Sequence, residues 1–253
     1  MDAPISLIDS HAHLDEIDDL EQSLKMARDL GIQAIVAVGV DLASNRKTLK
    51  IAKENRGYVY PAIGYHPWDI EEKDIQECLA FIGDHIDDCV AMGEVGLDYK
   101  TKVKKDLQRR VFQALLKISY DHKKPVIIHC RYSHQRAYEM IREVGIASAV
   151  FHWYTGPIDL LDKIIKNGYF VSATPALTYS PPHQEAIRKA PLERILLETD
   201  TPVVYGNHES RPKDVRTTLK EVARIKKIEV EEVAYLTTKN ACQFFGITLH
   251  LHL

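Results

Sequence analysis

The sequence of 253 residues lacks the features that mark secreted or membrane proteins. It has only four cysteines, none in a CxxC pair, which argues against a disulfide framework and against a zinc knuckle. The longest purely apolar run near its start, Ala34–Val38, is too short to span a bilayer. No basic segment followed by a cleavable apolar stretch opens the chain. We therefore expect a cytoplasmic protein with reduced thiols and no membrane partner.

A net positive charge is also missing, since the formal net charge is −3 at pH 7. A nucleic-acid partner would therefore have to be held by a local patch or by metal ions, because no overall basic field attracts it. Neither GxGxxG nor GxxxxGK[ST] occurs, which disfavours a doubly wound sheet with a phosphate loop. Apolar residues make up 45% of the chain, enough for a full core.

Short apolar, β-branched runs alternate with amphipathic segments along the whole chain. The predicted strands are Ile5–Ile8, Ala34–Gly39, Val59–Ile63, Val90–Met92, Val126–Ile128, Ala149–Phe151, Tyr169–Ser172 and Ile195–Leu197. Apolar residues recur with helical spacing between them, for example at Leu20, Leu24 and Ala27. Eight such units predict an α/β fold, a (β/α)₈ TIM-type barrel formed by residues 1–253 as a single domain, with an extra C-terminal helix after Val230. The closing LHLHL, Leu249–Leu253, is interpreted as a tail.

Two histidines, His11 and His13, follow the first predicted strand in the stretch LIDSHAHL. Residues two apart in an extended chain point to the same side, so both imidazoles could reach one metal ion. On their own they could equally be two ordinary polar residues at a strand end.

Further potential ligands occupy the same position relative to other strands. Glu94 follows the fourth strand, His129 the fifth, His152 the sixth and Asp200 the eighth. In a closed barrel the carboxyl ends of the strands form one mouth, where such barrels carry their chemistry. Each residue alone has a structural explanation, as a hydrogen-bonded surface histidine, a solvated loop charge or a cap. Together, four histidines and two carboxylates predict a site for zinc, magnesium or manganese.

Six short motifs give this pattern a family resemblance. They are DSHAHLD (residues 9–15), GYHPW (64–68), GEVGLDY (93–99), PVIIHCR (125–131), HWYTG (152–156) and ETDTP (198–202). In this order and spacing the sequence resembles the TatD-related metal-dependent deoxyribonucleases of the amidohydrolase superfamily. It departs from the commoner pattern at Trp68, where many relatives have a second histidine, and at Trp153 and Tyr154.

The resemblance implies a distorted (β/α)₈ barrel that holds two divalent metal ions. It implies that His11, His13 and Asp200 bind the first ion, that His129 and His152 bind the second, and that Glu94 bridges them. The substrate would be DNA or a small phosphoester. A water molecule activated by the two ions would hydrolyse a phosphodiester bond, and the enzyme would act on DNA from its ends. Asp200 is the expected proton shuttle.

Several other residues are candidates for contacts with the substrate. His66 resembles the family's non-ligand histidine and could donate a proton or bind phosphate, or be a plain loop histidine. Arg131 could pair with a phosphate or form a rim salt bridge, and Asp98 could contact substrate or hold its loop. The basic stretch 100–110 could contact phosphates at the mouth or be the solvated face of a helix. Tyr65, Trp68, Trp153 and Tyr154 could stack on bases or pack in the core.

Two acidic residues are candidates for supporting roles. Asp9 could orient a ligand histidine, and Glu198 could support the site or the fold.

Two alternatives stay open at this level. The same metals could serve a lactonase, an amidase or a phosphotriesterase of the same superfamily, although those branches often bridge the metals with a lysine. The chain could also be a non-catalytic metal-binding scaffold. No obligate protein partner is expected, and a monomer is the default.

Overall fold

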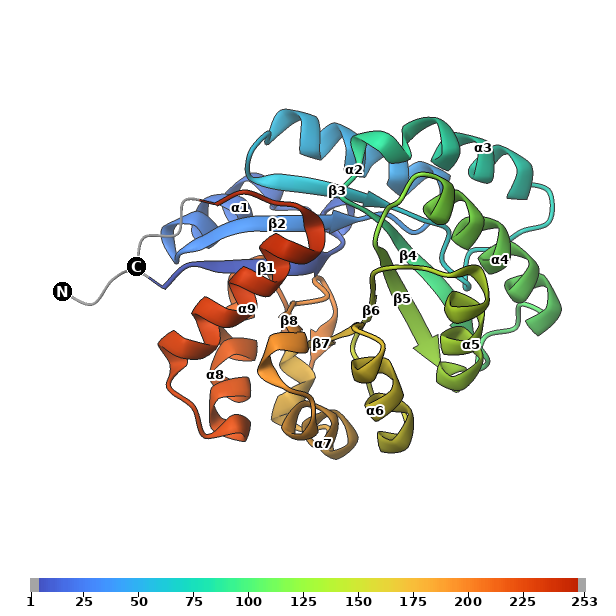
Figure 1. Cartoon of the computed structure of the whole chain (residues 1–253). Helices are drawn as coiled ribbons and strands as arrows, with labels where there is room; N and C mark the ends of the chain where they lie inside the picture. The colour runs from blue at the N-terminus through green and yellow to red at the C-terminus, as the bar shows by residue number, and fades with distance from the viewer. Residues whose placement is uncertain (1–4, 250–253) are drawn as a thin grey trace.

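The protein is described here by a computed structural model that covers residues 5–249, so residues 250–253 of the expected tail lie outside the described range. Eight parallel strands lie in the order β1 to β8, each hydrogen-bonded to the next, with helices around the outside (Figure 1). This arrangement confirms the predicted (β/α)₈ barrel. That residues 1–253 form a single domain stays a prediction.

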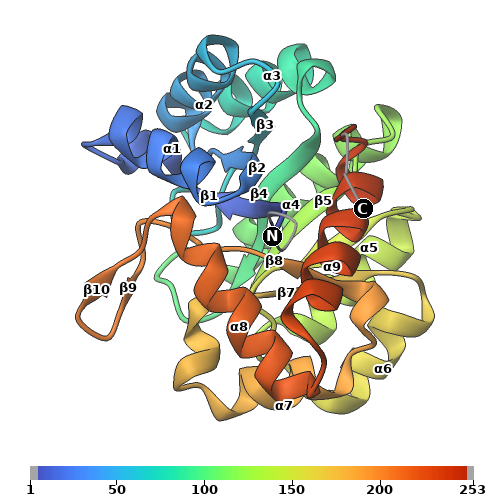
Figure 2. The same ribbon diagram turned by 90° about the vertical axis from the view of Figure 1, so that its left-hand side faces the viewer.

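The strands run in chain order around the barrel. They are β1 (Leu7–Ala12), β2 (Ile32–Val38), β3 (Val59–Ile63), β4 (Ala91–Asp98), β5 (Val126–Arg131), β6 (Ala149–Phe151), β7 (Phe170–Ala173) and β8 (Ile195–Leu197). A separate hairpin, β9 (Val204–Tyr205) and β10 (His208–Glu209), follows β8 and projects from the body of the barrel (Figure 2).

The helices follow the strands in alternation. They are α1 (Leu20–Asp29), α2 (Leu42–Glu54), α3 (Ile75–His85), α4 (Lys105–Asp121), α5 (His134–Val144), α6 (Ile158–Lys166), α7 (Pro181–Lys189), α8 (Val215–Lys226) and α9 (Val230–Phe245). Short 3₁₀ helices lie at Leu14–Glu16, Ile86–Asp88, Pro175–Thr178, Leu192–Arg194 and Pro212–Asp214. None of the helices in residues 5–249 combines the length and apolar character needed to cross a membrane.

The core has two parts. The larger lies between the strands and the surrounding helices, where apolar stripes such as that of α4 are buried. The smaller lies inside the barrel, where residues such as Val36 and Ile127 pack in one cluster with Phe244 and Phe245 of α9. The extra C-terminal helix therefore helps to fill the barrel interior, which explains why its apolar residues extend to its last turn.

The barrel closes unevenly between β1 and β8. An isolated bridge joins Ala12 of β1 to Thr201, in the segment that follows β8. Just beyond it the His13 amide donates to the Thr201 carbonyl (2.8 Å) and the Asp200 amide donates to the His11 carbonyl (2.9 Å). The barrel is therefore closed between β1 and the segment after β8 by main-chain hydrogen bonds of residues that are predicted to bind metal. This irregular closure fits the expected distortion of the barrel.

Candidate metal centre

Three strands continue further than predicted and carry site residues with them. β1 includes His11, β4 includes Glu94 and Asp98, and β5 includes His129. The register of β1 against β2 shifts between Asp9 and Ala12, and that of β4 against β5 shifts between Met92 and Val95. Such irregularities bend a strand and redirect a side chain, and they are frequent next to active sites.

One group of side chains joins the ends of β1, β4 and β8. The Nε2 atoms of His11 and His13 lie 3.2 Å apart. Glu94 Oε2 lies 3.3 Å from the first nitrogen and 3.6 Å from the second. Asp200 Oδ1 lies 3.5 Å and 3.3 Å from the same two nitrogens. Four ligand-type atoms from three distant segments therefore face one small volume.

This spacing fits a divalent metal ion. Ligand atoms held about 2.0–2.1 Å from a tetrahedral zinc ion lie about 3.3 Å from one another. The five separations that involve a histidine Nε2 span 3.2 to 3.6 Å. Two imidazoles and two carboxylates are also a donor set that borderline divalent ions accept. The residues present fit the metal that the sequence predicts.

The other oxygen of Glu94 faces a second group of imidazoles. Glu94 Oε1 lies 2.9 Å from His129 Nδ1, 3.5 Å from His66 Nε2 and 3.9 Å from His152 Nε2. His152 Nε2 also lies 3.6 Å from Asp200 Oδ2. The two carboxylates thus lie between the two sets of histidines, and all six predicted ligands converge.

Most of the histidines are anchored through the ring nitrogen that points away from this centre. His13 Nδ1 donates to the Val38 carbonyl (3.1 Å), and His129 Nε2 donates to Asp98 Oδ2 (3.1 Å). Such outer partners fix the orientation of a ligating imidazole and raise its basicity. His11 is the exception: its Nδ1 is buried without a hydrogen-bond partner among the described residues.

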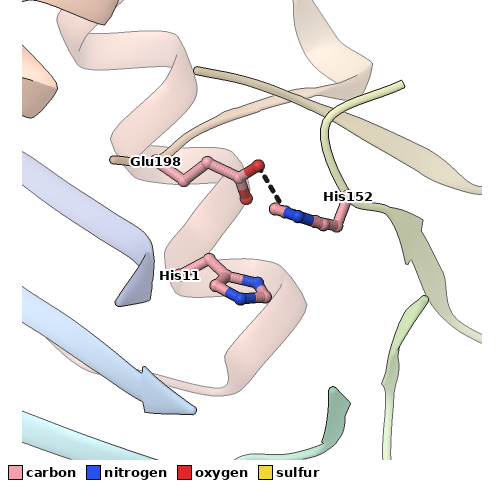
Figure 3. A group of neighbouring side chains, drawn as sticks. All are labelled: His11, His152 and Glu198. Carbon is pink, nitrogen blue, oxygen red and sulfur yellow. Dashed lines mark hydrogen bonds and ion pairs between the residues drawn. The ribbon is translucent and has the colours of Figure 1, made fainter. Parts of the chain in front are cut away.

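Glu198 anchors His152, next to His11 (Figure 3). Its Oε1 accepts hydrogen bonds from His152 Nδ1 (2.7 Å), from the Ser172 hydroxyl (2.6 Å) and from the Trp153 amide (3.2 Å). The side chain is fully buried, and the His11 ring stacks on the His152 ring at 4.1 Å between centroids. The choice that the sequence left open for Glu198 is therefore decided by position: it supports a candidate ligand.

Asp98 lies beside His129 and is not among the residues that line the cavity. Its carboxylate is fully buried, and Oδ2 accepts from both His129 Nε2 and the indole N–H of Trp68 (2.6 Å). Oδ1 accepts from the main-chain amides of Lys100 and Thr101. With both oxygens engaged and no exposed surface, Asp98 is positioned to orient His129 and to hold its loop, the second of its two expected roles, while a contact with substrate stays a prediction.

His66 projects its Nε2 toward Glu94 from the loop after β3. The Trp68 amide donates to His66 Nδ1 (3.2 Å), so a neutral His66 carries its proton on Nε2. Burial lowers the pKa of His66 to about 4, although Glu94 opposes that shift. Among the imidazoles of this centre, His66 is thus a neutral ring with an N–H directed inward.

The charged groups of the centre shift one another's ionisation. Burial alone would raise the pKa of Glu94, but His66 and His152 lower it well below its usual value. Burial likewise would raise the pKa of Asp200, yet His152 and His13 lower it to about 2. Both carboxylates therefore stay ionised at neutral pH, as metal ligands must be.

The motif residues around the ligands have packing roles. Asp9 is fully buried and accepts from the amide (2.9 Å) and hydroxyl (2.6 Å) of Thr199, which ties β1 to the end of β8. Its only link to His11 is that residue's main-chain amide at 3.4 Å. Asp9 thus positions the chain rather than the imidazole. Gly64 of GYHPW is required because a Cβ there would lie 2.5 Å from the Glu94 carbonyl oxygen.

The centre opens into a cavity of about 1440 Å³. Arg131 lines it and lies 3.9 Å from Asp98, with 41% of its side chain exposed, so both a phosphate contact and a rim salt bridge have a basis in the geometry. Of the basic stretch 100–110, Arg109 and Arg110 form surface ion pairs with Asp106 and Glu72. No member of that stretch is among the residues that line the cavity.

The four aromatic residues expected at the mouth divide into two pairs. Trp68 and Trp153 line the cavity, whereas Tyr65 and Tyr154 are fully buried and their hydroxyls bond to main-chain groups. Of the two interpretations that the sequence left open, the burial of both tyrosines favours core packing. The sequence of a loop does not show which of its aromatic side chains face the cavity and which are buried in the core.

Two supporting residues escaped the sequence reasoning. Ser172 on β7 binds the Glu198 carboxylate, and His134 at the start of α5 lines the cavity, where burial lowers its pKa to about 4. Ser172 carries no recognisable signal in sequence. His134 could have been found, since it lies five residues after His129 at the same mouth.

Comparisons with known proteins agree on one family. Residues 8–246 match the family model described as TatD related DNase. The chain is 29% identical over 98% of its length to the human protein named deoxyribonuclease TATDN3, of which it covers 98%. It is 30% identical over 95% of its length to the metal-dependent hydrolase YabD of Bacillus subtilis, of which it covers 99%. The crystal structure of YJJV, a TatD homologue from Escherichia coli, has the same fold, with a TM-score of 0.87 and 22% identity over 97% of this chain and 100% of that one.

Proposed function

This chain belongs to the family of TatD related DNases, and from that membership and the geometry of the metal centre we propose that it is a deoxyribonuclease. Its coarser class, a metal-dependent hydrolase, follows from the family and from relatives named as such. The finer proposal is that it hydrolyses phosphodiester bonds of DNA from strand ends and uses two divalent metal ions.

We assign the ligands in two groups. His11 and His13 would hold the first ion together with Asp200, and His129 and His152 would hold the second. Glu94 would contribute a carboxylate oxygen to each. Support comes from its two oxygens, since Oε2 lies 3.3 Å from His11 Nε2 while Oε1 lies 2.9 Å from His129 Nδ1.

Two ions held there would bind the phosphate oxygens, neutralise developing charge and lower the pKa of a bound water toward ~7. In hydrolysis the water oxygen forms a bond to phosphorus while the bond from phosphorus to the leaving oxygen breaks. Asp200 accepts the proton of the attacking water, because its carboxylate is ionised and lies among the ligands. His66 donates its Nε2 proton to the leaving oxygen.

Arg131 is proposed to bind a phosphate beside the scissile one. It lines the cavity, is partly exposed and follows His129 by two residues on the same strand. A guanidinium can pair with two phosphate oxygens at once, which fixes the orientation of the substrate as well as its charge.

The observation that carries this proposal is the position of Glu94 between the two sets of imidazoles. The test compares Glu94→Ala with wild type for bound metal and for release of nucleotides from single-stranded DNA labelled at its 3′ or 5′ end. Glu16→Ala is the matched control, since Glu16 lines the same cavity. We expect metal and cleavage to fall only in Glu94→Ala. Equal metal and equal cleavage in both variants would refute the assignment.

The same proteins separate the alternatives. A panel of lactones, amides and phosphotriesters tests the other branches of the superfamily, and turnover of those compounds without DNA cleavage would replace the nuclease. A non-catalytic scaffold would load metal yet cleave nothing, and it would bind a partner equally well after Asp200→Asn.

A further inference from the structure

Exposed apolar side chains gather at the metal cavity. Within residues 5–249, eight large apolar side chains are exposed, and four of them line this one cavity. These four are Trp68, Tyr132, Tyr179 and Val204. Since single exposed apolar residues normally scatter over a surface, such a concentration in one concave site marks a place where a ligand covers them.

The backbone holds two of the cavity's aromatic residues in an unfavourable conformation. Tyr132 has φ 56° and Trp153 has φ 42°, in the left-handed region that bulky residues avoid. Of the other described non-glycine residues with positive φ, Lys123 and Lys227 lie at helix ends, where this conformation is common, and the third is Asp200 of the centre itself. Conformations of this kind are energetically unfavourable and cluster at functional sites.

Tyr132, Trp153 and Tyr179 form what we call the aromatic arm of the cavity. They follow β5, β6 and β7, which are neighbouring strands, so the arm occupies one side of the mouth. Within the described residues, the rings of Tyr132 and Tyr179 pack on no other aromatic ring, and their hydroxyls make no hydrogen bond. Tyr132 is 75% exposed and Tyr179 is 55% exposed. Both rings are therefore free to receive a flat partner.

The arm is continuous with the metal centre. The Trp153 amide donates to Ser172 and to Glu198, the carboxylate that anchors His152. The ring of Trp153 lies 6.3 Å from the ring of His152, between centroids. A ligand with its phosphate at the centre would therefore place its next group against this ring.

Charge favours the same side for an anionic strand. Arg131 on β5 and Arg136 on α5 line the cavity beside the arm, and Glu139 of α5, which also lines it, pairs with Arg136 (3.3 Å). Glu16 and Asp69, which follow β1 and β3 on the other side of the barrel, line it there. A phosphate chain is attracted toward the first side and repelled from the second.

We propose that the aromatic arm is a nucleobase-binding subsite, in which Tyr132, Trp153 and Tyr179 stack on bases of the strand next to the scissile phosphate. The inference rests on the proposed function and extends it, because it names the part of the substrate that these residues contact. Flat rings joined by phosphates match the combination of exposed aromatic faces with the guanidinium of Arg131. Stacking on aromatic side chains is tolerant of sequence, so the subsite binds any base.

The test measures binding without cleavage. Wild type, Tyr132→Ala and Tyr179→Ala are titrated with fluorescently labelled oligothymidine in the presence of a chelator, and binding is followed by anisotropy. Tyr120→Ala is the matched control, because Tyr120 is also 55% exposed but lies on α4 and does not line the cavity. We expect each arm variant to bind roughly fivefold more weakly or worse, and the control to bind as wild type does.

An abasic oligonucleotide of equal length completes the test. Wild type should bind the abasic oligonucleotide more weakly than oligothymidine. The arm variants should bind the two oligonucleotides with similar affinity, because the tyrosine that would stack on a base has already been removed. Arm variants that bind both oligonucleotides as Tyr120→Ala does would overturn the subsite. If wild type with metal cleaves no phosphodiester but still prefers the base-bearing strand, the proposed function fails and the subsite stands. If the arm substitutions change neither binding nor cleavage of DNA, the subsite fails and the proposed function stands.

Discussion

Replacing Glu198 by glutamine should weaken metal binding while leaving the fold intact. All three donors that reach this side chain, from His152, Ser172 and Trp153, go to the single oxygen Oε1. The amide oxygen of glutamine can accept the same three hydrogen bonds in the same place. The substitution therefore removes the charge and preserves the shape.

The size of the effect follows from the loss of that charge. A hydrogen bond to a charged group contributes about 1.5–3 kcal/mol, against about 0.5–1.5 kcal/mol for a neutral one. The difference of about 1 kcal/mol in the bond to His152 Nδ1 corresponds to roughly five- to tenfold in affinity, at the lower end of the 10–100-fold typical of lost outer partners of metal ligands. His152 should keep its position but become a poorer donor to the ion.

Zinc affinity is measured by competition with a coloured chelator, and thermal unfolding in the presence of excess chelator checks the fold. Ser172→Ala is the control, since it removes one donor from Glu198 while the bond to His152 remains. It should change zinc affinity less than Glu198→Gln does. A folded Glu198→Gln protein that binds zinc as tightly as wild type would show that His152 is not a ligand, and the assignment of the second ion would have to be abandoned.

Three further outcomes are expected. Zinc added to the metal-free protein at 100 times its dissociation constant should stabilise it by about 2.7 kcal/mol. The resulting rise in melting temperature should be absent in Glu94→Ala and present in Glu16→Ala. Trp68→Phe removes the indole N–H that Asp98 accepts at 2.6 Å, so zinc affinity should fall severalfold in a chelator competition and recover in part in Trp68→His; identical affinities in all three proteins would contradict this. His183 is fully buried, its Nε2 accepts a hydrogen bond from the Thr174 amide, and burial lowers its pKa to about 4. Because this pKa lies below that of the unfolded chain, the contribution of neutral His183 to stability is complete above pH ~6.5 and is lost as the pH falls toward 4. The difference in unfolding free energy between metal-free wild type and His183→Gln should therefore shrink by up to about 3 kcal/mol over that range, and a difference that does not change with pH would disprove the argument.

The fold was predictable because its signals are local. Each strand is an apolar run and each helix an apolar stripe, and eight alternating units leave few ways of covering the strands on both faces. The errors lie at strand ends. β1, β4 and β5 continue through His11, Glu94 and His129, because polar residues at a barrel mouth can remain in the sheet while their side chains face the site.

The candidate ligands were predictable for a related reason. Parallel strands in one barrel present their carboxyl ends at one rim, so residue type and position after a strand are sufficient to group His11, His13, Glu94, His129, His152 and Asp200. Asp98 shows where this reasoning stops. It also follows a strand toward the mouth, but its side chain turns behind His129 and never reaches the cavity surface.

By itself, the sequence determined which chemical groups assemble and at which end of the barrel, because those properties depend on side-chain type and on the order of strands. Only the tertiary structure decided what supports each group. Glu198 meets His152 across 46 residues, and Asp98 meets His129 across 31. Whether a carboxylate reaches an imidazole nitrogen or passes beside it is settled within an ångström by strand register and by the packing of neighbouring side chains, and no spacing along the chain encodes that distance.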